Sequence, residues 1–320
     1  MGSKRTVRPP KLEAGSRVAL IAPAGPLLER DDLARGEELC VALGYEPIPG
    51  PNAGGHHGYL AGTDAERLSD LNRALNDRNI DAVWCLRGGY GMTRILEEVD
   101  YRAIERHPRP IIGYSDITAL LNAVTRATGM ITFHGPMSRS SMSPFSRWHH
   151  DRVLTLPGAA GRLGRIAPPA DVLVPGEPRI VTLRGGIAEG HLVGGNLSLL
   201  QCLIGTPWLP DFDGALLFIE DVGEDLYRVD RMLSHLRMVK ALQQLAGVIV
   251  GRFTEMDRGT GAGALGFDQV LAHYLLPLGI PAAYGFPIGH IDDQWTVPVG
   301  ARARLDADAG EVEILEGAVT

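Results

Sequence analysis

The sequence of 320 residues lacks the features of a disulfide-rich, membrane-spanning or nucleic-acid-binding protein. Its three cysteines, Cys40, Cys85 and Cys202, lie far apart without a CxxC pair, which excludes a disulfide framework and a zinc knuckle. The first apolar run, residues 18–24, is too short for a membrane span, and no secretory cleavage pattern follows it. The net charge of −7, without long blocks of like charge, argues against a nucleic-acid partner. We therefore expect a cytoplasmic protein with neither a membrane nor a nucleic acid as partner.

The spacing of a zinc site and the P-loop are also missing. None of the ten histidines shows the HExxH spacing of a zinc site, so the sequence predicts no metal. The stretch Arg87 to Gly91 resembles a nucleotide loop only weakly, because it has neither the GxGxxG pattern nor the lysine of a P-loop. No internal repeat of fixed period is present.

The pattern that is present is an alternation of short apolar runs and amphipathic helices. Hydrophobic residues make up 45% and charged residues 22%, as in soluble globular proteins, and the length suffices for two domains. A capping box at Thr63 and Glu66 predicts a helix over residues 64–76, and another helix follows Ser115. We expect buried strands over residues 17–23, 82–86, 110–114 and 129–133. This order predicts an α/β fold with a parallel sheet, in which ligands bind beyond the carboxyl ends of strands.

The second half resumes the same alternation after a stretch with little periodicity. We expect strands over residues 180–183, 215–220, 247–252 and 281–285, and a helix over residues 225–238. The sequence therefore predicts three parts: an N-terminal domain over 1–145, a linker over 146–178 and a C-terminal domain over 179–320.

The sharpest local signal is the run Ile111 to Ile117, in which an apolar strand ends at Gly113 and passes directly into a helix. Ser115 is expected on the tight turn, with its hydroxyl exposed at the positive end of the helix, a geometry that suits a nucleophile. The run matches four positions of the hydrolase pattern Gly-x-Ser-x-Gly, since the fifth is Ile117. A helix cap is the alternative role for this serine.

A nucleophilic hydroxyl needs a base, and the base needs an orienting group. His290 follows a predicted strand in a glycine-containing loop, although a surface histidine would fit that place too. The histidines at 56–57, 107, 149–150 and 235 lie in polar or helical surface contexts. Glu220 ends a buried strand, where an acid is usually paired or functional, whereas Asp221 and Asp225 fit the start of the next helix better.

Glycines follow several of the predicted strands. The stretch Arg87 to Gly91 could aim backbone N–H groups at an oxyanion or a phosphate. Arg184 and its two following glycines, and the stretch from Gly194 to Leu197, repeat this composition in the second half. Ordinary turns and helix starts would explain some of these stretches.

Six stretches in this order resemble the murein LD-carboxypeptidase family of serine peptidases, which includes the peptidases that give resistance to microcin C. The family's marks are present at residues 21–25, 87–91, 113–116, 194–197, 220–224 with Tyr227 and Arg228, and 289–290. The likeness extends from about Ser16 to the C-terminus.

The resemblance implies a triad of Ser115 as nucleophile, His290 as base and Glu220 as its orienting group. It implies an N-terminal flavodoxin-like domain, a C-terminal swivelling α/β domain, a homodimer and no cofactor. The reaction implied is release of the terminal D-alanine from a cytoplasmic muropeptide during cell-wall recycling. Asp116, Gly88 and Gly89 would then supply the oxyanion hole. Expected substrate contacts are Arg87, Tyr90, Arg184, Gly195 and Asn196, the arginines because a planar donor suits a terminal carboxylate.

Three alternatives remain open. The same triad could cleave a peptide–nucleotide antibiotic, for which Trp148, expected in a loop, could stack a base. Cys85 could be the nucleophile of an enzyme like the glutamine amidotransferases, because it too ends a strand before glycines. A non-catalytic module binding a small molecule would also have two α/β domains and a cleft.

Overall fold

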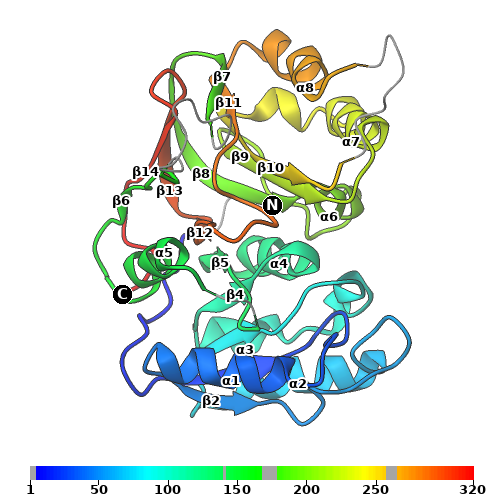
Figure 1. Cartoon of the computed structure of the whole chain (residues 1–320), viewed down its shortest axis with the longest axis vertical. Helices are drawn as coiled ribbons and strands as arrows, with labels where there is room; N and C mark the ends of the chain where they lie inside the picture. Colours follow the sequence, from blue (N-terminus) through cyan, green and yellow to red (C-terminus); the bar gives the residue numbers. More distant parts are fainter. Residues whose placement is uncertain (1–4, 140–141, 168–178, 257–264) are drawn as a thin grey trace.

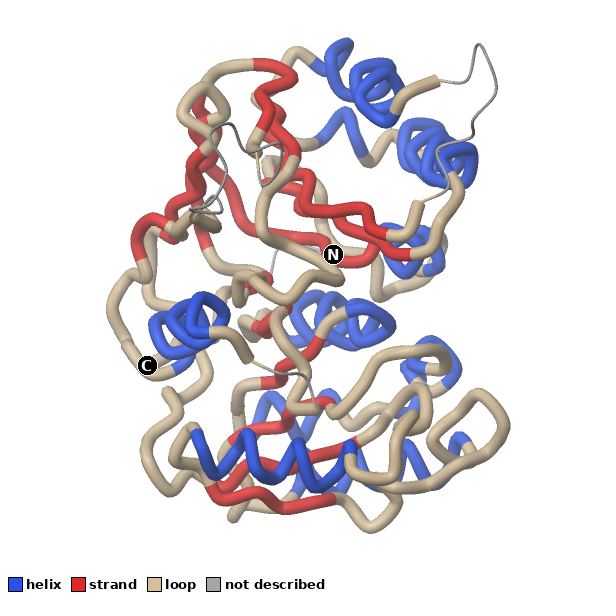
Figure 2. Tube along the Cα trace, in the orientation of Figure 1, coloured by secondary structure: helices blue, strands red, loops and turns tan. Residues whose placement is uncertain are grey.

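The computed structural model describes residues 5–139, 142–167, 179–256 and 265–320. It contains two sheets with helices packed against them, one sheet in each half of the chain (Figures 1 and 2). The α/β fold expected from the sequence is confirmed.

The first sheet has the strand order β12-β5-β4-β3-β1-β2. Its first five strands in the chain are parallel and follow the order 2-1-3-4-5 of flavodoxin-like folds. Their bounds are β1 Arg17–Ile21, β2 Glu46–Pro49, β3 Ala82–Cys85, β4 Ile111–Gly113 and β5 Thr132–His134. The helices of this half are α1 Asp32–Ala42, α2 Asp64–Asn76, α3 Tyr101–Arg106, α4 Thr118–Thr128 and α5 Pro144–Leu154, with single turns η1 Met92–Arg94, η2 Leu96–Glu98 and η3 Ser115–Ile117.

Helices cover both faces of this sheet because alternate residues of each buried strand point to opposite sides. Val18 and Leu20 of β1 pack with Cys40 of α1 and with Leu154 of α5. Ala19 and Ile21 pack in a second cluster with residues of α2, α3 and α4. The result is a doubly wound domain whose five parallel strands point their carboxyl ends to one edge.

The second sheet has the order β6-β14-β13-β8-β9-β10-β11-β7. Strands β8 to β11 are parallel, and antiparallel strands extend the sheet at both edges. The bounds are β6 Gly161–Arg162, β7 Val181–Arg184, β8 Ile187–Asn196, β9 Leu216–Val222, β10 Gly247–Thr254, β11 Ala282–Tyr284, β13 Arg302–Asp306 and β14 Glu311–Ile314. One face packs on α6 Leu197–Cys202, α7 Leu226–Met238 and α8 Phe267–Leu275; the remaining turns are η4 Leu242–Gln244 and η5 Leu276–Leu278.

The two halves share a core and a strand. The face of the second sheet opposite α7 belongs to the same buried cluster as Leu20 and Trp84 of the first half. Strand β12, Val297–Val299, pairs antiparallel with β5 and so completes the first sheet with residues from the far end of the chain. The helix α4 lies at the boundary between the halves (Figure 1).

Most predicted elements are present with small shifts of their ends. The helix over 64–76 is α2, and both hydrogen bonds of its Thr63–Glu66 capping box form. The predicted linker contains the helix α5 and the short strand β6, which periodicity did not indicate, and its residues 168–178 lie outside the described part. Among the described residues, no helix is both long and apolar enough to cross a membrane.

Candidate active site

Ser115 occupies a strained turn between β4 and η3. Its φ is 61°, in the left-handed region that non-glycine residues rarely adopt. Gly113 makes the turn possible, because a Cβ there would lie 2.9 Å from Cγ2 of Ile117. The turn follows the carboxyl end of a central parallel strand, as in the nucleophile turns of hydrolases.

The glycine loop after β3 packs against this turn. A Cβ on Gly88 would lie 2.8 Å from Cβ of Ser115, 3.1 Å from its Oγ and 3.2 Å from the backbone nitrogen of Asp116. Only glycine lets the loop come this close. The structure therefore brings Ser115 together with Gly88 and Asp116, two of the three residues expected to supply an oxyanion hole.

The Asp116 side chain ties the two segments together. It is buried, and its Oδ2 accepts a hydrogen bond of 2.8 Å from the backbone N–H of Met92, just beyond the glycine loop. Burial raises the pKa of this carboxyl to about 6, against the lowering effects of the Met92 hydrogen bond and of Arg67.

Glu220 and His290 form a buried pair on the second half. Nδ1 of His290 lies 2.8 Å from Oε2 of Glu220, which has no exposed surface, while the histidine side chain is 19% exposed. Gly289, at φ 129°, permits this contact, since a Cβ there would lie 3.1 Å from the same oxygen. With Nδ1 bonded to the carboxylate, the other ring nitrogen is available as a base.

Tyr114 links the halves of the site. Its ring lies edge-on to that of His290, with centroids 4.8 Å apart, and 5.8 Å from the ring of His134. His134 is fully buried, and its ring nitrogens have no hydrogen-bond partner among the residues that the structure describes. Burial, followed by the charge of His290, lowers its pKa to about 3. Sequence reasoning gave neither residue a role. Tyr114 lies next to the serine in sequence and His134 ends the strand β5, and these two positions could have indicated them as site residues.

The predicted substrate residues are not all near this pair. Tyr90 follows the glycine loop and is 49% exposed, in edge contact with exposed Tyr59. Arg87 is half-buried and donates to the carbonyl of Pro26 from Nη1 at 2.6 Å. Arg184 is misplaced for this role: it pairs with Ala282 at the first residue of β11. It therefore lies three strand spacings, about 14 Å, from β9 and toward the amino ends of the strands.

Gly195 and Asn196 are occupied by the protein itself. Gly195 packs on Thr118, whose Oγ1 would be 2.6 Å from a Cβ there. The amide of Asn196 donates to Asp221 at 2.8 Å, and its oxygen accepts from the backbone of Leu199 and so caps α6. These contacts leave neither residue directed at a substrate.

The structure argues against the roles considered for Cys85 and Trp148. Cys85 lies within β3 with no exposed surface, and burial raises the pKa of its thiol, so it is unsuited to nucleophilic attack. Trp148 belongs to the helix α5 rather than to a loop. The guanidinium of Arg152 lies 4.4 Å from the centre of its ring and covers one face.

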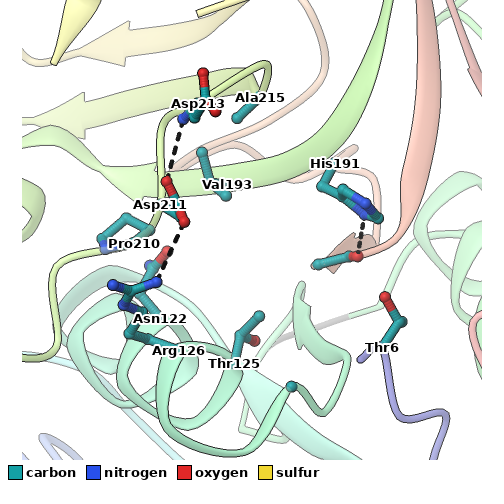
Figure 3. Close-up of a pocket in the computed structure, with 12 residues that line it drawn as sticks. Thr6, Asn122, Thr125, Arg126, His191, Val193, Pro210, Asp211, Asp213 and Ala215 are labelled. Carbon is teal, nitrogen blue, oxygen red and sulfur yellow. Dashed lines mark hydrogen bonds and ion pairs between the residues drawn. The ribbon is translucent and has the colours of Figure 1, made fainter. Parts of the chain in front are cut away.

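Other candidate sites lie away from these residues. In the described ranges, no group of three or more histidine, cysteine or acidic residues could hold a metal ion. A cavity of about 160 Å³ opens between α4 and β8 (Figure 3), lined by Asn122, Arg126, His191 and Asp211 among others. None of the predicted site residues lines it.

Comparison with known proteins gives matches over both halves of the chain. Residues 18–135 match the LD-carboxypeptidase N-terminal domain, and residues 189–305 match the LD-carboxypeptidase C-terminal domain. A probable murein peptide carboxypeptidase of Bacillus subtilis is 37% identical over 98% of this chain and 95% of its own. The murein tetrapeptide carboxypeptidase of Pseudomonas aeruginosa is 34% identical over 91% of this chain and 94% of its own.

A solved structure of the microcin C7 self-immunity protein MccF without ligand superimposes with a TM-score of 0.88. It is 26% identical and covers 98% of this chain and 100% of its own. Both domain models match in order, and the relatives extend over nearly the whole sequence. The chain therefore belongs to the LD-carboxypeptidase family and is a serine-type carboxypeptidase.

Proposed function

We propose that this enzyme releases the terminal D-alanine from murein tetrapeptides by cleaving the bond between that residue and the L-centre before it. Ser115 is the nucleophile, His290 the general base and acid, and Glu220 the group that orients the imidazole. The observation that carries the proposal is the left-handed φ of 61° at Ser115. A strained non-glycine residue at the end of a central strand is typical of a functional turn.

The reaction divides into two displacements. Oγ of Ser115 attacks the carbonyl carbon of the L-centre residue, and Nε2 of His290 takes its proton. The tetrahedral adduct collapses, and the amine of D-alanine leaves with that proton. Water then attacks the acyl ester and gives its proton to His290, which passes that proton to Oγ of Ser115 as the tripeptide leaves. Glu220 stabilises the imidazolium through its 2.8 Å contact with Nδ1.

The oxyanion formed in each step needs donors beside Ser115. The backbone N–H of Asp116 and one from the Gly88–Gly89 turn supply them in this proposal, supported by the close approach of Gly88. Arg87 binds the terminal carboxylate of the substrate, with Pro26 holding its guanidinium in place. Tyr90, exposed on the same loop, contacts the peptide stem.

The proposed function also includes a cellular location, an oligomeric state and a division into domains. The enzyme acts in the cytoplasm in cell-wall recycling, which is consistent with the three cysteines, all free in the structure. It works as a homodimer, with a nucleophile domain over 1–145, a linker over 146–178 and a domain over 179–320 that carries the histidine and the glutamate.

Cleavage of a peptide–nucleotide is the second candidate function, favoured by the superposition on MccF. The Arg152 guanidinium over the ring of Trp148 counts against base stacking on that side chain. A tetrapeptide and an aminoacyl sulfamoyl adenosine, given to the enzyme in parallel, would separate the two functions.

The deciding experiment follows D-alanine release from a tetrapeptide by mass spectrometry. Ser115→Ala is expected to lower kcat by at least about 10⁴-fold. Ser69→Ala, which removes a hydroxyl exposed on α2, is the matched control and should leave turnover unchanged. A peptide ending in L-alanine should not be cleaved. Full activity of Ser115→Ala would exclude the serine mechanism.

A further inference from the structure

The helix that follows the nucleophile is hydrogen-bonded directly to the second half of the chain. Oγ1 of Thr118, the first residue of α4, accepts from the backbone N–H of Asn196 at 3.0 Å. One turn later, the Asn122 amide donates to the carbonyl of Gly194 at 2.8 Å. Thr118, Asn122 and Asn196 are buried. Figure 3 shows Asn122 and Arg126 of α4 facing Val193 of β8 across the small cavity beside this contact.

Two glycines at the end of β8 allow close approach, Gly195 to the helix α4 and Gly194 to the neighbouring strand β9. A Cβ on Gly195 would lie 2.6 Å from Oγ1 and 2.7 Å from Cγ2 of Thr118. A Cβ on Gly194 would lie 1.9 Å from the carbonyl oxygen of Phe218 in β9. Both glycines have positive φ, so the backbone there also requires glycine. The end of β8 is thus shaped to receive α4.

Asp221 holds this strand end from the other side. Its Oδ1 accepts from the Asn196 amide at 2.8 Å and from its own neighbour Val222 at 2.9 Å. Its Oδ2 accepts from the backbone N–H and the hydroxyl of Ser198, at 3.0 and 2.7 Å. The carboxylate is 3% exposed and has four donors, so its side chain is directed at α6 and not at the start of α7.

These contacts join the two parts of the proposed site by a short route. Thr118 follows Ser115 by three residues, and Asp221 follows Glu220 directly. Asn196 joins them, bonded to Thr118 through its backbone and to Asp221 through its side chain. Every member of this route is buried, which strengthens its hydrogen bonds and makes a broken one costly.

We propose that Asp221 is a positioning residue which, through Asn196 and Thr118, sets the distance between Ser115 and the His290–Glu220 pair. The proposal rests on the triad of the proposed function. Asp221 touches no reacting atom and acts only through the placement of two elements. A displacement of about 1 Å between a nucleophile and its base can cost about 100-fold in rate.

The test exchanges the two partners. Asp221→Asn puts two amides face to face, and Asn196→Asp puts two carboxylates face to face. Each single variant is therefore expected to lower kcat about 100-fold and to change KM by no more than twofold. The double variant restores one donor and one acceptor at the same place. It should recover at least tenfold over either single variant, a coupling that a double-mutant cycle measures.

Further variants separate positioning from folding and from substrate binding. Thr118→Val keeps the side-chain volume, removes one acceptor, and should lower kcat about tenfold. Asp211→Asn is the matched control, since it breaks the exposed 3.3 Å ion pair between Arg126 and Asp211 beside the route and should leave kcat unchanged. Circular dichroism and thermal unfolding confirm that each variant is folded.

The results that would contradict the positioning role differ from those that would contradict the proposed triad. If Ser115→Ala is inactive while Asp221→Asn and Thr118→Val keep full kcat, the positioning role is wrong and the serine mechanism stands. The proposal would also be overturned by a raised KM in Asn196→Asp, or by single variants that lose kcat while the double variant does not regain it. Retained activity in Ser115→Ala would remove the proposed function itself.

Discussion

At the scale of single residues, the site depends on how closely two backbones approach. Gly88 faces the Cβ and Oγ of Ser115 with no room for a side chain, and the nearby Asp116 carboxylate fixes the segment beyond the loop through Met92. Ser115, the proposed nucleophile, and the proposed oxyanion donors are therefore held by backbone contacts, whose positions vary less than those of long side chains.

Replacing Gly88 tests this closeness. Gly88→Ala places a methyl group 2.8 Å from Cβ of Ser115, so the loop or the serine must move, and we expect about 100-fold lower kcat. Steady-state kinetics on a tetrapeptide would measure it. Gly54→Ala, whose Cβ would meet nothing within 4 Å, is the control. Unchanged kcat in Gly88→Ala would contradict a site built on this contact.

The single residues that sequence could indicate were those at strand ends. Ser115, Glu220 and His290 each follow an apolar run, and that position alone marks them. The contact between His290 and Glu220, 70 residues apart, required the fold. Asp221 was expected near the next helix and instead binds α6, because neighbouring residues of a strand point to opposite sides. His149 and His150, expected on the surface, are buried since α5 packs on Trp84.

At the scale of elements, α2 shows how a local signal defines a boundary. The Thr63 hydroxyl accepts from the backbone of Glu66, whose carboxylate accepts from the Thr63 backbone at 2.8 Å. Without the box, the backbone N–H groups of Thr63 and Glu66 would have no partner within the helix.

Removing the cap should destabilise the protein without altering the site. Thr63→Ala loses the acceptor for the Glu66 N–H and should lower the free energy of unfolding by about 1 kcal/mol, as measured by denaturant titration. Thr63→Ser keeps the hydroxyl and should cost only a fraction of this. Equal stability of the alanine and serine variants would show that the box does not contribute.

Strands and helices with weak local sequence patterns could not be predicted from the sequence. Strand β8 contains two glycines at its end and alternates exposed and buried residues only in part, so its sequence does not predict a strand. Strand β12 has three residues, one of them proline, and exists because β5 offers an edge to pair with. The helix α5 has an apolar face too irregular for its period to be recognised. Each depends on partners distant in sequence.

At the scale of the whole molecule, three buried histidines couple stability to pH. Desolvation lowers the pKa of His134 to about 3, of His149 to about 4 and of His150 to about 3. The unfolded chain binds these protons near pH 6.5 and the folded chain does not, so stability falls as the pH drops below that value. Asp116, with its pKa raised to about 6, has the opposite effect between about pH 4 and 6.

His134→Phe should make the protein less sensitive to acid. From pH 7 to pH 5, His134 costs the wild type about 2 kcal/mol that the variant does not lose. Phenylalanine also fits the aromatic contacts with Tyr114 and Phe218 and leaves no buried nitrogen unpaired. Urea unfolding at both pH values measures the difference. His56→Gln replaces a histidine that is exposed, so this control should lose as much stability between the two pH values as the wild type. An equal loss of stability in His134→Phe would contradict the role given to His134.

The pairing of β12 with β5 also constrains the order in which the protein can be completed. During synthesis the first five strands emerge early, but the outer flank of β5 has no neighbour until residue 299 has left the ribosome. An uncovered flank of this kind invites pairing with another chain. The nascent first half therefore keeps this flank of β5 unpaired until residues 297–299 have been made.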